Sequence, residues 1–191
     1  MKRVTLFSCA VSLMFTTTFS QSAPDSAATM KAWQSYMTPG DVHKMIAKDD
    51  GQWVEEITTW MAPGAPPTKS SAIAENKMVL GGRFQQSTHH GSFMDMPFEG
   101  MSTLGYDNVK KIFQITWADN MGTGLMYMEG PWDDATKTIH LKGKTTDPVT
   151  GKDINVRETV KFIDENTQKV EMFSTQNGKE FKMMEINLKR K

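Results

Sequence analysis

Short β-type runs separated by turn residues occupy almost the whole chain from residue 51 onward. Runs that recur every 10–15 residues or so are typical of an antiparallel all-β domain, because a parallel crossover needs a longer connection. Closure of such a meander into an up-and-down barrel removes its edges and leaves room for a ligand. We therefore expect an up-and-down antiparallel barrel of about ten strands, with an open sheet or a sandwich as the alternative. The strands are expected near 52–60, 69–79, 82–90, 97–106, 110–118, 123–130, 136–145, 151–163, 167–175 and 179–189.

Turn residues mark the boundaries between the later runs. Asp and Asn side chains bond nearby backbone amides and accept turn conformations, and Asn-Gly favours a two-residue hairpin. These residues predict turns at Asp107-Asn108, Asp133-Asp134, Asp147-Pro148 with Gly151, Asp164-Glu165-Asn166 and Asn177-Gly178.

The first residues have the three parts of a secretory signal peptide. Lys2 and Arg3 precede an uncharged, largely apolar stretch over 4–19, and the small residues Ser20 and Ser22 offer cleavage sites. A membrane anchor is the alternative, but the stretch is interrupted by Ser and Thr and falls short of the roughly 20 apolar residues that span a bilayer. We expect a signal peptide over 1–22 and export to the periplasm or out of the cell. No later segment predicts a membrane span.

Composition narrows the chemistry of the mature chain. Cys9 is the only cysteine and lies in the expected signal peptide, which excludes disulfides and thiol catalysis after cleavage. The chain has 22 basic and 22 acidic residues, so loss of Lys2 and Arg3 leaves a net charge of −2. That balance argues against a nucleic-acid partner, which favours a basic stripe.

The segment from 23 to 50 precedes the β-type runs, which form a domain over 51–191. We expect a flexible leader over 24–31, followed by a helical segment in two pieces broken at Pro39-Gly40. The second piece runs from Asp41 to Lys48 and has apolar residues at helical spacing.

Alternation within the runs predicts the residues that face a cavity. Ile154, Val156, Val160 and Phe162 share a face, and Glu158 interrupts it, so this carboxyl must be paired or take up a proton. We predict that a small, mainly hydrophobic ligand contacts Arg83, Phe98, Tyr106, Phe113, Ile115, Trp117, Met126, Met128, Val156 and Glu158. For Arg83, the alternatives are an anionic ligand group or ion pairs with Asp107, Asp119 or Glu158.

Two other functions stay open. One is an enzyme for a small molecule that uses Glu158, His89 or Asp119 as acid or base. The other is copper handling, since imidazole and thioether are copper ligands; its weak candidates are His89, His90, Met94 and Met96. The sequence contains no nucleophile elbow, zinc helix or phosphate loop. It therefore assigns no catalytic residue and no cofactor, and favours binding over catalysis.

Gly51-Gln52-Trp53, which follows a helical segment and precedes the strands, resembles the lipocalin and calycin superfamily. The resemblance implies that Trp53 plugs one end of the barrel and that a cation from Lys189, Arg190 or Lys191 lies over its ring. A haem site like that of the nitrobindin branch would need an inward histidine, for which His89, His90 and His140 are the candidates.

Several longer stretches resemble the bacterial family named domain of unknown function 1579. They are Leu80-Gly81-Gly82-Arg83-Phe84, Pro97-Phe98-Glu99-Gly100, Leu104-Gly105-Tyr106-Asp107 and Trp117-Ala118-Asp119. This resemblance implies a lipocalin-like barrel of unassigned activity and supplies no catalytic residues.

Overall fold

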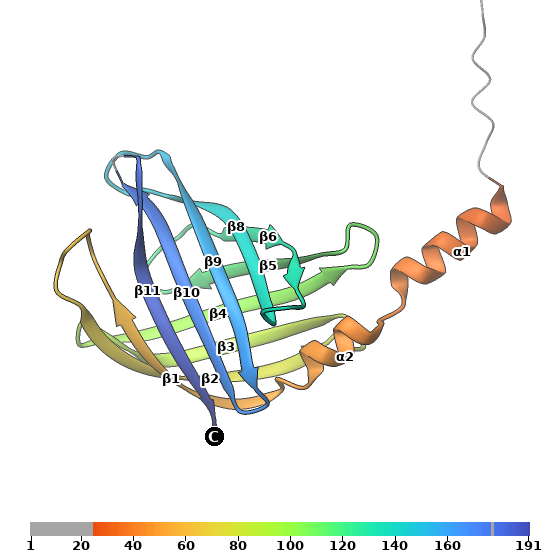
Figure 1. Cartoon of the computed structure of the whole chain (residues 1–191), viewed down its shortest axis with the longest axis horizontal. Helices are drawn as coiled ribbons and strands as arrows, with labels where there is room; N and C mark the ends of the chain where they lie inside the picture. Colours follow the sequence, from red (N-terminus) through yellow and green to blue (C-terminus); the bar gives the residue numbers. More distant parts are fainter. Residues whose placement is uncertain (1–24, 177) are drawn as a thin grey trace, which may run out of the picture.

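A computed structural model describes residues 25–176 and 178–191 and shows a closed antiparallel β-barrel preceded by two helices (Figure 1). Apart from β6 and β7, strands that are consecutive in the sequence pair with each other, and pairing of β1 with β11 and of β6 with β8 closes the circle. The strands are β1 (Gly51–Thr59), β2 (Thr68–Val79), β3 (Phe84–Phe93), β4 (Met96–Asp107), β5 (Ile112–Asp119), β6 (Met126–Gly130), β7 (Trp132–Asp133), β8 (Thr138–Thr146), β9 (Asp153–Asp164), β10 (Thr167–Gln176) and β11 (Lys179–Arg190).

The short strand β7 continues β6 beyond Pro131, and both pair with β8. Proline has no backbone N–H to give to a ladder, so the strand is interrupted at this residue. With β6 and β7 counted as one interrupted strand, the barrel has ten strands. The predicted fold class is confirmed.

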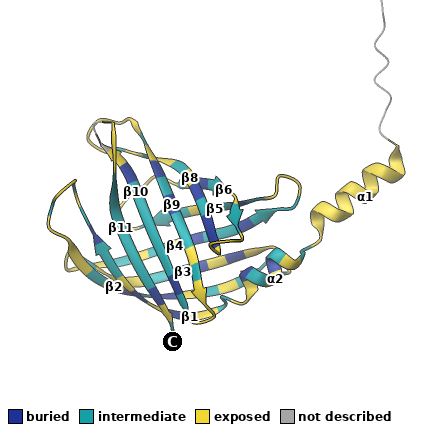
Figure 2. Cartoon of the chain, viewed as in Figure 1, coloured by how far each residue is buried: buried dark blue, intermediate teal, exposed yellow. Residues whose placement is uncertain are grey.

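Two helices, α1 (Ser26–Met37) and α2 (Asp41–Ala47), precede the barrel, and the predicted break between them is confirmed. The expected flexible leader over 24–31 is wrong for its described part, because α1 begins at Ser26. The Asp25 side chain caps this helix by accepting the backbone N–H of Ala27 at 3.1 Å. None of the residues of α1 is buried, and the helix projects away from the barrel (Figures 1 and 2). No helix in the described part of the chain has the length and apolar character to span a membrane.

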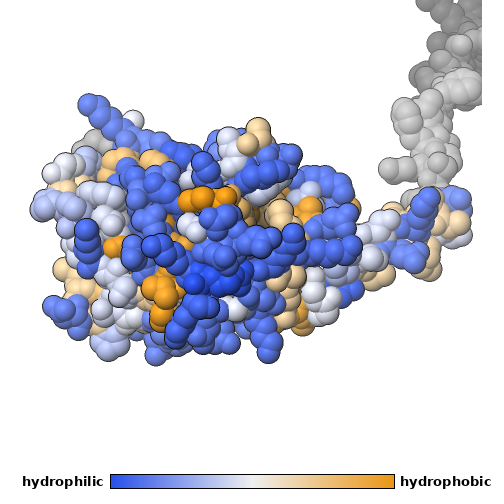
Figure 3. Space-filling model, turned by 60° about the horizontal axis from the view of Figure 1, so that its bottom comes forward, coloured by the Kyte–Doolittle hydropathy of each residue, from blue (hydrophilic) through white to orange (hydrophobic). Residues whose placement is uncertain are grey.

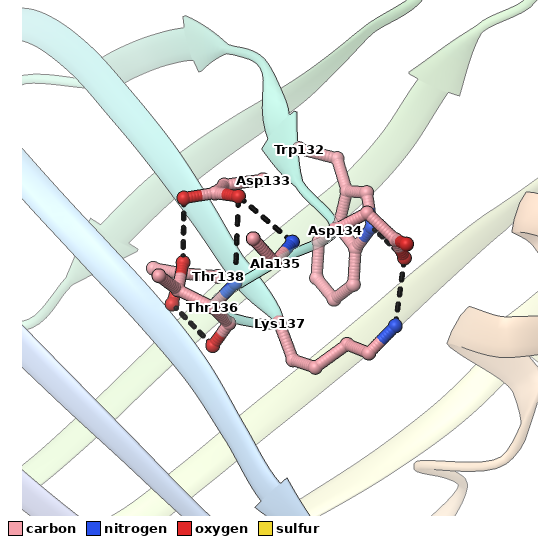
Figure 4. Close-up of polar contacts among 7 residues, drawn as sticks. All are labelled: Trp132, Asp133, Asp134, Ala135, Thr136, Lys137 and Thr138. Atoms are coloured by element: carbon pink, nitrogen blue, oxygen red, sulfur yellow. Dashed lines mark hydrogen bonds and ion pairs between the residues drawn. The ribbon is translucent and has the colours of Figure 1, made fainter.

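Aspartate side chains hold the turns together. Asp107 accepts the backbone N–H groups of Val109 and Lys110 at 2.8 and 2.9 Å. Asp133 does the same between β7 and β8, where it accepts the Ala135 N–H at 2.9 Å and the Thr136 hydroxyl at 2.7 Å (Figure 4). The turns predicted from these residues are confirmed. Asn177 lies outside the described residues, but β10 and β11 on either side of it pair as a hairpin.

One end of the barrel is closed by α2 and by a clasp between the two ends of the domain. Ile46 of α2 is fully buried against the barrel core. Trp53 is also fully buried, and the Arg190 guanidinium carbon lies 4.4 Å from the centre of its ring. Arg190 also donates to the backbone carbonyls of Lys48 and Asp50 at 2.6 and 2.8 Å. The cation expected over Trp53 is therefore Arg190.

Glycines permit the close approach that joins β6 to β8. A Cβ at Gly130 would lie 1.8 Å from the carbonyl oxygen of His140, and one at Gly143 would lie 2.1 Å from that of Tyr127. No side chain fits at such distances, so β6 and β8 can pair only if these two residues are glycine.

Candidate functional site: the barrel interior

The register of the strands defines which side chains face the interior. Residues paired across antiparallel strands point to the same side of a sheet. The face of the buried Trp53 therefore continues through Ala74 and His89 to Gly100. Extended around the barrel, it includes the predicted cavity residues Phe98, Tyr106, Phe113, Ile115, Trp117, Met126, Met128, Val156 and Glu158. Their role in binding a ligand stays a prediction.

The interior is packed at the end near α2 and accessible from the other end. Near α2, inward side chains such as Phe113 and Leu141 have no exposed surface. Met172 and Met184 face inward about halfway along their strands and are only partly buried. Both side chains lie on the inner face of the barrel wall, so the packing against them is incomplete there. The partly buried inward residues toward the far end are Ile57, Phe98, Trp117, Met126, Ile154 and Phe181.

A carboxylate and an imidazole form a pair on the inner wall. Glu55 of β1 is 3% exposed, and both of its oxygens lie 3.2 Å from Nδ1 of His89 on β3. Because an ionised carboxylate only accepts, His89 donates through Nδ1. Its Nε2 is buried and has no hydrogen-bond partner among the described residues. The pair therefore orients an imidazole whose second nitrogen is buried and unpaired among the described residues.

An aromatic wall lies beside this pair. The His89 ring meets Trp117 edge-on with ring centres 4.9 Å apart, and Phe98 stacks on Trp117 at 6.4 Å. Trp117 donates through Nε1 to Asp119 at 2.7 Å, and Asp119 also accepts the backbone N–H of Met121 at 2.9 Å. Two of the predicted acid–base candidates, His89 and Asp119, thus contact the same indole.

Glu158 is an isolated carboxyl in the barrel core. It points inward from β9, between Leu141 of β8 and Met172 of β10, and is 7% exposed. Within the described residues it has no side-chain hydrogen bond or ion pair, and burial alone raises its pKa to about 7. The sequence analysis required this carboxyl either to have a partner or to take up a proton. In the structure it has no partner among the described residues.

Arg83 does not belong to the interior. It lies in the exposed turn between β2 and β3 and donates to the backbone carbonyls of Met37 and Leu80 at 2.7 and 3.1 Å. It does not pair with Asp107, Asp119 or Glu158 as considered from the sequence. Its guanidinium instead ties the end of α1 to the barrel.

The metal-ligand candidates are not brought together. His89 faces the interior, but the adjacent His90 faces outward and is exposed. Met94 and Met96 are 60% and 49% exposed. In the described part of the chain, no group of three His, Cys, Asp or Glu side chains is arranged to hold a metal ion. Of the three histidines considered for haem, only His89 faces inward, since His140 pairs with the outward-facing Thr159.

Glu55 is not among the site residues predicted from the sequence, although a signal for it exists. Glu55 stands two positions after Trp53, so strand alternation places both on the same face. Its partnership with His89 on β3 spans the intervening strand β2 and depends on a register that the sequence does not define.

Two hollows occur on the outer surface. One of about 330 Å³ lies between the α1–α2 connection and the turn after β4. The other, of about 230 Å³, lies on the outer face of β8, β9 and β10. Neither contains a buried charged side chain, and both are separate from the barrel interior.

Comparison with known proteins supports the fold and names a family. No curated protein matches the chain. Among solved structures, that of Rv2717c from M. tuberculosis is similar, with a TM-score of 0.61 and 14% sequence identity over 81% of this chain and 99% of the other. At this identity the similarity concerns the fold. The profile of the family described as "Protein of unknown function (DUF1579)" matches residues 38–190, and the chain therefore belongs to the DUF1579 family.

Proposed function

We propose that this protein is an exported, lipocalin-like binding protein that holds a small, mainly hydrophobic molecule inside its barrel. The observation that carries the proposal is the state of the inward side chains. Aromatic, aliphatic and methionine residues such as Trp117, Met172 and Met184 face a closed interior and yet keep accessible surface. Ligand sites typically combine such apolar walls with a few convergent polar groups, which Glu55, His89 and Asp119 supply here.

The free energy of apolar burial favours the interior over the outer surface as the place for an apolar ligand. An apolar ligand gains roughly 25 cal/mol for each Å² of apolar surface removed from water, and methionines adapt to irregular shapes. The outer face seen in Figure 3 is mostly hydrophilic and has only small, separated hydrophobic areas. The interior thus offers an apolar ligand more contact than this face does.

Export is supported by the sequence of residues 1–22, which lie outside the described part of the chain. The positive start, the apolar stretch and the small residues at its end are the parts that a signal peptidase system reads. A binding protein outside the cytoplasm is consistent with the cysteine-free mature chain.

Native mass spectrometry tests the proposal directly. The protein is purified under mild conditions from the cells that produce it, and its intact mass is compared before and after denaturation. We expect a fraction with the added mass of one small molecule, released on unfolding. A chain that carries no added mass and binds no compound from a panel of apolar probes contradicts the proposal.

A pair of variants then locates the ligand. Ile57→Trp adds bulk to the interior, while Thr58→Trp adds the same side chain to the outer face one residue later in β1. We expect the first to reduce binding at least tenfold and the second to leave it unchanged. Thermal unfolding of both variants checks that the barrel is intact. Equal binding by both variants would place the ligand elsewhere.

The Glu55–His89 pair favours a second candidate function, an acid–base enzyme. A carboxylate that holds one imidazole nitrogen and leaves the other free is the arrangement of a general base. If the bound molecule is a substrate, incubation with the protein changes its mass, and His89→Gln abolishes that change while binding persists. Unchanged ligand after prolonged incubation argues for binding alone.

A further inference from the structure

We propose that the interior ligand is an organic cation, with an apolar body and a protonated amine that pairs with Glu158. This inference rests on the proposed function and adds the chemical class of the ligand. It follows from the charges that face the interior, from the bonds that these groups already make, and from the isolation of one of them.

The charges facing the interior are mostly negative. Three carboxyls, from Glu55, Asp119 and Glu158, face inward against one imidazole, that of His89. Among the described strand positions from 53 to 188, the one lysine or arginine that shares this face is Lys179, which is exposed at the first position of β11, at the rim far from α2. Arg190 lies at the closed end, where it covers Trp53 and donates to backbone carbonyls. An anionic ligand such as a fatty acid would therefore meet like charge, whereas a cation meets complementary charge.

Two of the three carboxyls already have partners. Glu55 accepts from His89 through both oxygens, and Asp119 accepts from Trp117 and from the backbone of Met121. Glu158 has no side-chain partner among the described residues, although it is only 7% exposed. It is therefore the inward carboxyl with its hydrogen-bonding capacity unused.

The surroundings of Glu158 suit an ion pair with an amphipathic ligand. On β8 and β10, the side chains that face it belong to Leu141 and Met172, and no ionisable group from either strand shares its face. None of the strands β1, β3 and β5, which carry Glu55, His89 and Asp119, is adjacent to β9 in the sheet. A buried carboxylate without a counter-charge is unfavourable, and an ammonium group supplies both the charge and hydrogen-bond donors.

The pH dependence follows from the same arrangement. An ammonium pairs with the ionised form of Glu158, and burial raises the pKa of this carboxyl to about 7. The ionised fraction is then roughly a tenth at pH 6 and nine tenths at pH 8, so apparent affinity falls roughly tenfold between these two values. A primary alkylamine stays protonated over this range, so the change reports on the protein.

Three probes with the same ten-carbon chain test the inference: decylamine, decanol and decanoate. Binding to the full mature protein is measured by isothermal titration calorimetry at about pH 8 and about pH 6. We expect decylamine to bind more tightly than decanol by at least tenfold at the higher pH, and decanoate to bind most weakly. We also expect the advantage of decylamine over decanol to shrink at the lower pH.

Two variants assign the effect to Glu158. Glu158→Gln keeps the shape and removes the charge, so we expect decylamine to lose its advantage while decanol binds as before. Glu56→Gln removes a carboxylate from the exposed outer face of β1 and controls for the change in net charge. We expect this variant to behave like the wild type with all three probes.

Each outcome has a defined meaning. If none of the probes binds, the proposed function itself fails. If decanol or decanoate binds as well as decylamine, the barrel holds apolar molecules but the inference of a cation is wrong. A full amine preference retained by Glu158→Gln also overturns the inference, because another group would then hold the amine.

Discussion

At the scale of single residues, Glu158 links stability to pH. Its pKa is about 7 in the folded protein and 4.5 for an unperturbed glutamate. Below pH 4.5 the carboxyl is protonated in both states and costs nothing. As pH rises to 7 the unfolded chain ionises first, so the free energy of unfolding falls, by up to about 3 kcal/mol from this group. Burial also raises the pKa of Asp49 to about 7, and this residue acts in the same direction.

Glu158→Gln separates the contribution of Glu158 from that of Asp49. We expect the variant to raise the free energy of unfolding by about 1–3 kcal/mol at pH 8, because no charge remains to be buried. Near pH 4 the two proteins should be equally stable. Urea denaturation at both pH values measures the difference. A gain of the same size at both pH values would show that charge is not its cause.

Arg190 is the second residue with a large expected effect. Arg190→Ala removes the cation over Trp53 and the donors to three carbonyl groups, those of Lys48, Asp50 and Glu165. We expect a loss of about 2–4 kcal/mol of stability by urea denaturation. Lys189→Ala, at the exposed neighbouring position, is the control and should change stability by less than about 0.5 kcal/mol. Equal losses would contradict a specific role for the clasp.

At the scale of elements, most strands and turns follow from local chemistry and could be predicted. The Asp107 and Asp133 turns form because a carboxylate bonds amides two or three residues away, which needs no knowledge of the rest of the chain. Helix α1 was missed over its first turns because it buries no residue and so has no apolar periodicity. The helix propensity of the residues from Ser26 onward, together with the Asp25 cap, is sufficient to form this helix.

The candidate site was predictable only in part. Alternation places Trp117 and Glu158 on inward faces, because the side-chain period of a strand is fixed. The Glu55–His89 contact and the difference between the packed and the accessible end depend on pairing between distant strands. Arg83 was misplaced because its backbone partners in α1 and the β2–β3 turn are set by tertiary structure.

The junction of β6 and β8 provides a prediction at this scale. Gly143→Ala would place a Cβ 2.1 Å from the Tyr127 carbonyl, so the two strands must separate. We expect a loss of more than about 2 kcal/mol of stability or a failure to fold, seen by circular dichroism and thermal unfolding. Gly122→Ala is the control, because a Cβ there has no neighbour within 4 Å. A normal melting transition for Gly143→Ala would contradict the close approach.

At the scale of the whole molecule, the export that we propose predicts the first residue of the mature chain. Cleavage after Ser20 or Ser22 would leave Gln21 or Ala23 as the first residue. N-terminal sequencing and intact mass of the protein recovered from the cell envelope or the medium measure this. Replacement of both Lys2 and Arg3 by Glu should leave an uncleaved precursor inside the cell. Recovery of the full-length wild-type chain from the cytoplasm would argue against export.

The pairing of the first and last strands also governs when the protein can fold. β1 faces β11 along its length, from Trp53 opposite Arg190 to Thr59 opposite Met184. A ribosome makes β1 first and β11 last, so the seam between them forms only after nearly the entire domain has been synthesised, and such distant contacts form slowly. A nascent chain that reaches a translocation channel during synthesis is therefore still unfolded. For the export that we propose, this topology would keep the chain unfolded during passage through the channel and delay barrel formation until translocation is complete.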